Sequence, residues 1–283
     1  MFDCPKVKEV TERIMPRRAG EWKDRDSYLM FLRHLAAYYF ARTVADGLSV
    51  LDLGCGAGYG AAIIAETAQK VIALDSSLMA LLAVDPRPAK TAFITGDGVR
   101  LPLHNKSFDL AVSFQVIEHI RDEAQYLNEV RRILVPGGRF IISTPNRALR
   151  LLPFQPPFNP YHVREYDRRS LRKTLSRWFT EVDIQGLCAT PEITAIEEKR
   201  LKQNPVRTYM KLIAQEVLPH AAVETIRGFV RGIERGHRPP LTFQESLGDS
   251  PPFKEDAYSC DDFWVDADRV ETSLDLIGIC RKI

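Results

Sequence analysis

The feature that most constrains this chain is a cluster of glycines directly after a short apolar run. Residues 50–60 read VLDLGCGAGYG, with glycine at positions 54, 56, 58 and 60. Glycine permits positive φ and places no Cβ between the backbone and a ligand. A helix that starts after such a turn offers free N–H groups in its first turn. The stretch therefore predicts a strand, a tight turn that cradles a ligand, and a helix.

Short apolar strands alternate with helical stretches along most of the chain. Strands are expected at 48–53, 70–75, 92–95, 107–114, 139–144, 180–187 and 273–283, and helices at 26–45, 58–68, 76–84, 123–134 and 168–179. We expect the fourth of these helices to stop at Pro136-Gly137-Gly138, before the next strand. Such alternation is typical of parallel βαβ units with right-handed crossovers. We therefore expect an α/β fold with a doubly wound, mostly parallel, seven-stranded sheet.

Three parts of the chain are distinguished by their patterns. Residues 1–46 form an N-terminal helical cap, in which Leu29, Tyr39 and Phe40 belong to an apolar helical stripe. In this cap Tyr28, Arg33 and His34 either cover the ligand as a lid or pack on the core. Residues 47–190 and 256–283 form the main domain. Residues 191–255 break the strand–helix rhythm, with helical segments around 208–218 and 222–233, and we expect a helical insertion that acts as a substrate lid.

Acidic side chains follow the next two strands. Asp75 ends the second strand and Asp97 follows the third. Ligands of doubly wound sheets bind beyond the carboxyl ends of the strands, where Asp75 can accept both hydroxyls of a ribose. Asp97 can accept a hydrogen bond from the exocyclic amine of adenine. The structural alternatives are a helix cap by Asp75 at Ser76 and a turn of Asp97 with Gly98.

The spacing D-x-G-x-G-x-G from Asp52 differs from a nicotinamide fingerprint, which needs glycine or alanine where Tyr59 stands. It resembles motif I of the class I S-adenosylmethionine-dependent methyltransferases, and specifically the type 11 and ubiquinone-pathway groups. Residues 95–120 and 127–146 resemble the later motifs. The resemblance implies a Rossmann-like fold with S-adenosyl-L-methionine as cofactor. By position, the cofactor-binding residues are Asp52, Gly54, Cys55, Gly56, Asp75, Ser76, Asp97, Gly98 and Gln115.

Candidate catalytic residues follow the fourth and fifth strands. Glu118 and His119 lie in SFQVIEHI, and His162 lies in NPYHVREY. A histidine can remove the proton of an attacking hydroxyl, so we assign catalysis to His119, His162 and Glu118. The alternative for His119 is simple packing of its loop.

Two subgroups of the family raise the question of a metal. Members of the small-RNA 2′-O-methyltransferases and of the ubiquinone-pathway enzymes hold a divalent ion with E-x-x-E-H, and the former also use a later histidine. Gln115 replaces the first acid here, which weakens a site for a hard cation. Glu118, His119 and His162 remain as a partial set of ligands, and we expect no metal.

Aromatic residues and prolines surround His162. The aromatic residues are Phe154, Phe158, Tyr161 and Tyr166, and the prolines are Pro153, Pro156, Pro157 and Pro160. Because prolines stiffen a loop, this segment is expected either to build the acceptor pocket or to form a hydrophobic plug.

Charge and cysteine content exclude several classes of protein. Net charge is +2, and a basic stretch at 121–180 is offset by an acidic one at 241–275. Without an RNA-binding module, the basic stretch is a solvated face and we expect no nucleic-acid partner.

Five scattered cysteines without C-x-x-C argue against a disulfide scaffold or a zinc cage. No signal peptide and no apolar run of about 20 residues is present, so we expect a cytoplasmic protein without a membrane span.

These observations together predict an S-adenosylmethionine-dependent methyltransferase that acts on a small-molecule acceptor, at oxygen. The alternatives are an RNA methyltransferase and a non-catalytic module that binds the cofactor.

Overall fold

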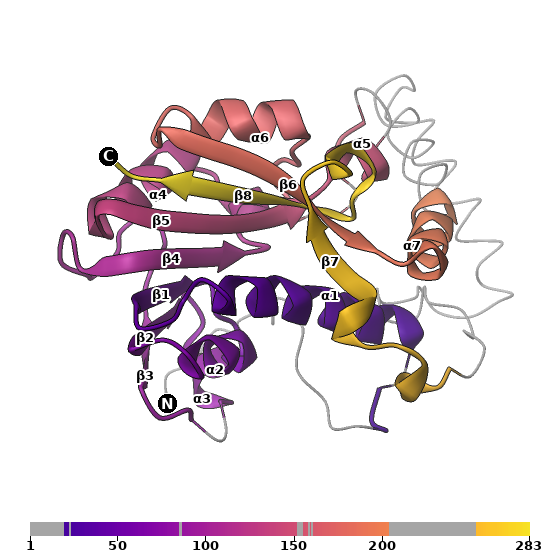
Figure 1. Ribbon diagram of the computed structural model, residues 1–283, viewed down its shortest axis with the longest axis horizontal. Coiled ribbons are helices and arrows are strands. Elements are labelled where there is room, and N and C mark those ends of the chain that lie inside the picture. Colours follow the sequence, from indigo (N-terminus) through magenta and orange to yellow (C-terminus); the bar gives the residue numbers. More distant parts are fainter. Residues whose placement is uncertain are drawn as a thin grey trace, which may run out of the picture.

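The computed structural model describes residues 20–22, 24–84, 87–151, 155–157, 159, 161–203 and 253–283. The strands are β1 (Ser49–Leu53), β2 (Lys70–Asp75), β3 (Thr91–Thr95), β4 (Phe108–Phe114), β5 (Leu134–Pro145), β6 (Glu181–Ala189), β7 (Phe263–Asp266) and β8 (Asp275–Arg281). They form one sheet in the order β3-β2-β1-β4-β5-β8-β6-β7 (Figure 1). The first five strands are parallel to one another, whereas β8 runs antiparallel to both of its neighbours. The expected doubly wound, mostly parallel sheet is confirmed.

The sheet has eight strands rather than the predicted seven. The additional strand is β7, which pairs antiparallel with β6 from Ala189↔Phe263 to Gly186↔Asp266. Its sequence, FWVD, has only four residues, and of these only Phe263 is buried. A strand this short, with one buried side chain, has no periodic pattern that sequence reasoning could detect.

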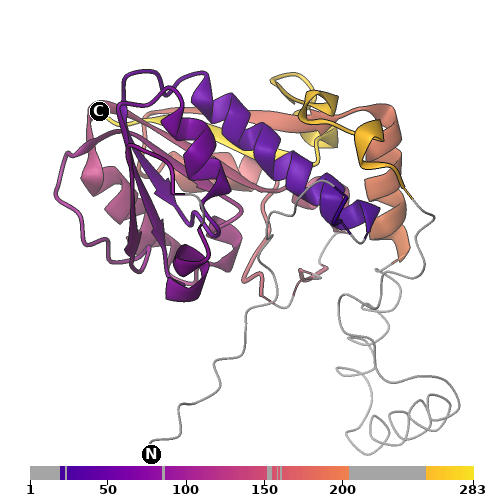
Figure 2. The same cartoon turned by 90° about the horizontal axis from the view of Figure 1, so that it is seen from below.

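Helices cover both faces of the sheet (Figures 1 and 2). They are α1 (Arg25–Arg42), α2 (Tyr59–Ala65), α3 (Leu78–Leu82), α4 (Glu123–Ile133), α5 (Arg147–Arg150), α6 (Arg168–Leu175) and α7 (Pro191–Gln203). One apolar core lies under α1, α2 and α3, and a second lies under α4 and α6. Along β1, Val50 joins the first core while Leu51 and Leu53 join the second, because successive side chains of a strand point to opposite faces. Asp52 consequently faces α1.

None of the helices in the described ranges has the length and hydropathy of a membrane span.

The helix predicted at 123–134 ends one residue early, and the segment Pro136–Gly138, which was expected to separate it from the next strand, lies inside β5. Helix α4 already ends at Ile133, and β5 begins at the next residue. Phe108 of β4 pairs with Leu134 of β5, and Leu110 pairs with Arg139. Between these two pairs β4 advances by two residues and β5 by five. A bulge in β5 therefore absorbs the proline and the glycines, which such irregularities tolerate.

The predicted insertion begins with α7, and the described part of this helix packs on the main domain. Ile193 is buried in the core beneath α1, and the Glu197 carboxylate lies 3.6 Å from the Arg33 guanidinium of α1. The helical segments expected around 208–218 and 222–233 lie outside the described residues. The division of the chain into cap, main domain and lid stays a prediction.

Three of the four glycines after β1 are required by the packing of the protein itself. A Cβ added at Gly54, Gly58 or Gly60 would lie 2.4 Å from Val116, 2.8 Å from Phe93 or 2.0 Å from the Tyr38 ring, respectively. A Cβ at Gly56 would meet nothing within 4 Å, although its φ of +53° also favours glycine. Gly56 is thus the position at which the turn leaves its backbone open to a ligand.

The close packing of Gly60 against Tyr38 can be tested by whether Gly60→Ala raises or lowers the free energy of unfolding. Gly60 lies in α2 without positive φ, so helix propensity alone predicts that Gly60→Ala stabilises the protein by about 1 kcal/mol. Overpacking against the Tyr38 ring predicts instead a loss of about 1–3 kcal/mol. We expect the loss, measured by urea unfolding. Gly47→Ala, at an open site with φ of +68°, is the control and reports backbone strain alone. A more stable Gly60→Ala protein would contradict the packing.

Candidate active site

The predicted cofactor residues gather at one edge of the sheet. The glycine turn follows β1, Asp75 ends β2, Asp97 follows β3 and Gln115 follows β4. These four strands are parallel neighbours, so their carboxyl ends meet. The edge is the one at which doubly wound sheets bind ligands.

Asp75 ties the glycine turn to the end of β2. Its Oδ2 accepts a hydrogen bond from the Gly56 N–H at 2.9 Å, and its Oδ1 accepts one from the Ser77 N–H at 2.8 Å. Helix α3 is capped by the Ser77 hydroxyl, while Ser76 is exposed. Asp75 is thus a structural anchor of the glycine turn as well as the predicted ribose ligand.

Asp52 is completely buried and faces the cap helix. The Tyr38 hydroxyl donates to its two carboxylate oxygens at 3.2 and 3.4 Å. Burial raises the pKa of Asp52 to about 7; the hydrogen bond from Tyr38 opposes that shift and the Asp75 charge adds to it. Sequence reasoning placed Tyr39 on the buried stripe of this helix, but Tyr39 is 37% exposed and its neighbour Tyr38 is the buried residue.

Asp97, Gly98 and Cys55 differ in what they offer a ligand. Asp97 is exposed, and its Oδ1 accepts a hydrogen bond from the Val99 N–H at 3.0 Å, which closes the turn that was the structural alternative. Gly98 lies against the ring of Tyr126, since an added Cβ would be 3.2 Å from it. Cys55 is buried in the core beneath α1, so the turn presents its backbone rather than its thiol.

Gln115 adopts a left-handed conformation with φ of +57°. Its backbone N–H donates to the Ser143 carbonyl at 3.0 Å, and its side-chain Nε2 donates to the Ser143 hydroxyl at 3.2 Å. Positive φ is uncommon in residues other than glycine, and such strain clusters at functional sites. The two bonds to β5 hold the residue where β4 ends.

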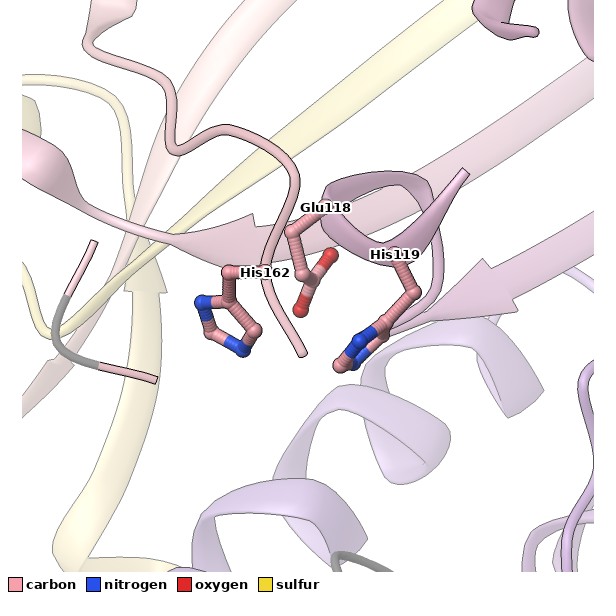
Figure 3. Close-up of side chains that lie close together, drawn as sticks. All are labelled: Glu118, His119 and His162. Atoms are coloured by element: carbon pink, nitrogen blue, oxygen red, sulfur yellow. The ribbon is translucent and has the colours of Figure 1, made fainter. Parts of the chain in front are cut away.

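The three predicted catalytic residues lie together (Figure 3). Glu118 and His119 belong to a single 3₁₀ turn, η1 (Ile117–His119), directly after β4. One potential ligand atom from each of Glu118, His119 and His162 lies within 4.8 Å of the other two. The loop that carries His162 is fixed to this turn by a hydrogen bond from the Val163 N–H to the Glu118 carbonyl at 2.7 Å.

Both histidines use Nδ1 for a structural hydrogen bond. His119 Nδ1 is 3.1 Å from the carbonyl oxygen of Tyr161, and His162 Nδ1 is 2.8 Å from Glu165 Oε1. Carbonyl and carboxylate oxygens only accept, so in each neutral ring Nδ1 carries the hydrogen and Nε2 the lone pair. Burial disfavours a charged Glu165, but His162 and Arg150 outweigh it and lower its pKa. Arg150 Nε lies 3.3 Å from Glu165 Oε2.

Protonation of the cluster follows from its burial. Burial, aided by the neighbouring His162, lowers the pKa of His119, so its ring is neutral at pH 7. Burial raises the pKa of Glu118 to about 8. Glu118 Oε2 accepts a hydrogen bond from the Thr144 hydroxyl at 3.0 Å, whereas Oε1 has no hydrogen-bond partner among the described residues. This oxygen is buried.

The aromatic segment around His162 is only partly described. Tyr166 is buried in the core beneath α4 and α6 and donates to Glu123, so it does not line an acceptor pocket. Tyr161 is 46% exposed. Phe154 and Phe158 lie outside the described residues.

Of the three cap residues considered as a lid, Arg33 and His34 are held inside the fold, which agrees with the packing alternative, whereas Tyr28 is partly exposed. Arg33 is buried, with Asp275 of β8 at 3.1 Å and Glu197 of α7 at 3.6 Å. His34 Nδ1 lies 3.3 Å from the Tyr59 hydroxyl, and burial lowers the pKa of His34 to about 3. Sequence reasoning had no signal for the Arg33 network, because its acids come from distant segments.

Comparison with known proteins agrees with this geometry. The family model described as "Methyltransferase domain" matches residues 51–142. A probable S-adenosylmethionine-dependent methyltransferase of Mycolicibacterium smegmatis is 40% identical over 61% of this chain and 65% of its own length. A Mycobacterium tuberculosis protein of the same description is 35% identical over 60% of this chain and 62% of its own length. The match thus spans just under two thirds of these relatives.

More distant matches extend the comparison. A ubiquinone biosynthesis O-methyltransferase of Caulobacter sp. is 30% identical over 44% of this chain and 53% of its own. The fold matches a putative methyltransferase solved with the Haloferax volcanii Trm112 activator, with a TM-score of 0.54, 16% identity and coverage of 89% and 91%. A possible histamine N-methyltransferase of Thermotoga maritima matches with a TM-score of 0.51 and 14% identity, over 90% of this chain and 93% of its own.

The glycine turn, Asp75 and Asp97 lie within residues 51–142, the segment that the family model matches. This segment is therefore similar to the class I S-adenosylmethionine-dependent methyltransferases, and the similarity implies S-adenosylmethionine as the cofactor.

Proposed function

We propose that the protein transfers the methyl group of S-adenosylmethionine to a hydroxyl of a small-molecule acceptor. The observation that carries this proposal is the adjacency of two groups of residues. The glycine turn follows β1, and the cluster of Glu118, His119 and His162 builds on the turn after β4, the strand paired with β1. A cofactor on the first group would present its methyl end toward the second.

The residues of the first group fit the cofactor part by part. Asp75 would hold the ribose, Asp97 the adenine, and Asp52 with the open backbone at Gly56 the methionine arm. When bound, the cofactor supplies an electrophilic methyl group on a sulfonium, and alignment of the acceptor oxygen with it accounts for much of the rate.

The residues of the second group suit removal of the acceptor's proton. The Nε2 lone pair of His162 can take that proton, because Glu165 fixes the Nδ1–H form of the ring and Arg150 fixes Glu165. Once protonated, the imidazolium is stabilised by the same carboxylate. His119 offers a second neutral Nε2 in the same space. A positioned base contributes about 10²- to 10⁴-fold.

Oxygen as the acceptor atom is supported by relatives described as ubiquinone biosynthesis O-methyltransferases. An RNA acceptor receives less support from the basic stretch. The exposed Arg168 lies 3.9 Å from Glu271, and Arg172 lies 4.0 Å from Asp183. Partial neutralisation of this kind is typical of a solvated face.

A second role of the catalytic cluster, divalent-cation binding, also has a specific observation behind it. One potential ligand atom from each of Glu118, His119 and His162 lies within 4.8 Å of the other two, and each histidine is oriented by an oxygen on its Nδ1. Histidines that bind metals are generally held in this way. Two imidazoles and one carboxylate suit zinc or manganese better than magnesium.

Removal of the Asp75 carboxylate tests the cofactor site. We expect Asp75→Ala to weaken S-adenosylmethionine binding at least tenfold in calorimetry, because both the ribose acceptor and the bond to Gly56 are lost. Asp46→Ala, which removes an exposed carboxylate before β1, is the control and should bind normally. Unchanged affinity in a folded Asp75→Ala protein counts against the assignment.

Replacement of His162 tests the base. With methyl-labelled cofactor and a panel of phenols and sugars analysed by mass spectrometry, His162→Ala should lower turnover about 10²-fold or more while cofactor affinity stays near wild type. The exposed His104→Ala variant is the control. Full turnover in His162→Ala would remove the residue from the mechanism.

Removal of divalent cations with EDTA distinguishes a cluster that acts as a general base from one that binds a cation. If the cluster acts only as a base, turnover is unaffected by EDTA, and zinc or manganese gives no calorimetric signal with the wild type. If it holds a cation, EDTA abolishes turnover, the metal restores it, and His119→Ala loses the binding signal. His104→Ala again serves as the control.

A further inference from the structure

We propose that Tyr38 of the cap helix is a positioning residue of the cofactor site, whose phenol orients the Asp52 carboxylate toward the ammonium group of the cofactor's methionine arm. The inference rests on the proposed function, because it takes S-adenosylmethionine as the ligand of the glycine turn. Under this inference a residue of α1, which lies outside the glycine motif, takes part in binding the cofactor.

The contact is centred on the carboxylate. The Tyr38 hydroxyl lies 3.2 Å from one Asp52 oxygen and 3.4 Å from the other, and both residues are almost completely buried. A donor shared between the two oxygens limits rotation of the carboxylate plane. Hydrogen bonds to charged groups are stronger than those between neutral groups.

The Tyr38 ring is itself held by three residues of two elements, α2 and β4. It lies against Gly60 of α2, at the place where a Cβ would be 2.0 Å from the ring. It makes edge contacts with Phe114 at the end of β4, at a centroid distance of 4.8 Å, and with Tyr59 at 5.9 Å. The last glycine of the motif is therefore explained by this ring, and the hydroxyl has little freedom to leave Asp52.

A cation beside Asp52 would offset the burial that raises its pKa. Within the described ranges its interactions are with the neutral Tyr38 hydroxyl, with Tyr59 and with the like charge of Asp75. A buried carboxylate is costly unless it is paired. Asp52 stands at the start of the glycine turn, where an ammonium group of a bound amino acid would supply the missing charge. The hydrogen bond from Tyr38 favours the charged form that such pairing requires.

Two ligands that differ in the amino-acid arm separate this role from general packing. S-adenosylhomocysteine carries the ammonium and carboxylate groups, whereas 5′-methylthioadenosine has the same nucleoside without them. We expect Tyr38→Phe to weaken binding of S-adenosylhomocysteine about tenfold in calorimetry and to leave binding of 5′-methylthioadenosine unchanged. The control is Tyr39→Phe, one residue away on the exposed side, which should bind both ligands normally.

A double-mutant cycle completes the test. In Asp52→Asn protein, the further change Tyr38→Phe should cause little additional loss for S-adenosylhomocysteine, because the two residues act as a unit. Equal weakening of both ligands by Tyr38→Phe, additive losses in the cycle, or no loss at all would each overturn the proposal. If the wild type binds neither ligand, the proposed function fails and this inference fails with it. Asp52→Asn alone provides the same two-ligand comparison should Tyr38→Phe not fold.

Discussion

The parallel pairing of β1 with β2 on one side and β4 on the other determines where every candidate functional residue lies. Parallel strands end together, so the side chains and turns that follow them share one edge. Hydrogen bonds across that edge then fix the local geometry: Asp75 at the end of β2 holds Gly56, and Ser143 of β5 holds Gln115. The loop bearing His162 is held to this edge by a hydrogen bond to the backbone of Glu118. The order of the strands thus places the site, and side-chain hydrogen bonds then fix its local geometry.

Sequence patterns were sufficient for those parts of the fold that bury a continuous apolar surface. The parallel strands and the helices between them were predictable because each buries a run or a stripe of apolar residues. The patterns failed where burial is decided by a distant partner. Tyr38 and Tyr39 are chemically alike and adjacent, and Tyr38 is buried against Gly60, Phe114 and Asp52, which come from other segments of the chain. The strand β7 and the bulge at Pro136–Gly138 depend on a neighbouring strand to complete them.

The candidate site divides in the same way. Its residue types and their order along the chain follow from the motifs, and the structure places Glu118, His119 and His162 close together. The orientation of the two imidazoles could not be predicted, because it is set by a backbone carbonyl and by Glu165 within a non-repeating loop. Nor could the sequence indicate that most of the motif glycines are needed for internal packing, since a motif does not record which neighbour excludes the Cβ.

The buried Arg33 has a consequence for how this chain can be divided. Its guanidinium is shared by Asp275 of the last strand and Glu197 of α7, so this ion-pair network joins three segments that lie far apart in the sequence. A fragment lacking the first helix would remove the guanidinium that lies 3.1 Å from the buried Asp275 carboxylate, and burial of a carboxylate without its ion-pair partner is costly. The first and last elements of the described chain are therefore electrostatically interdependent, and neither is a detachable accessory of the sheet between them.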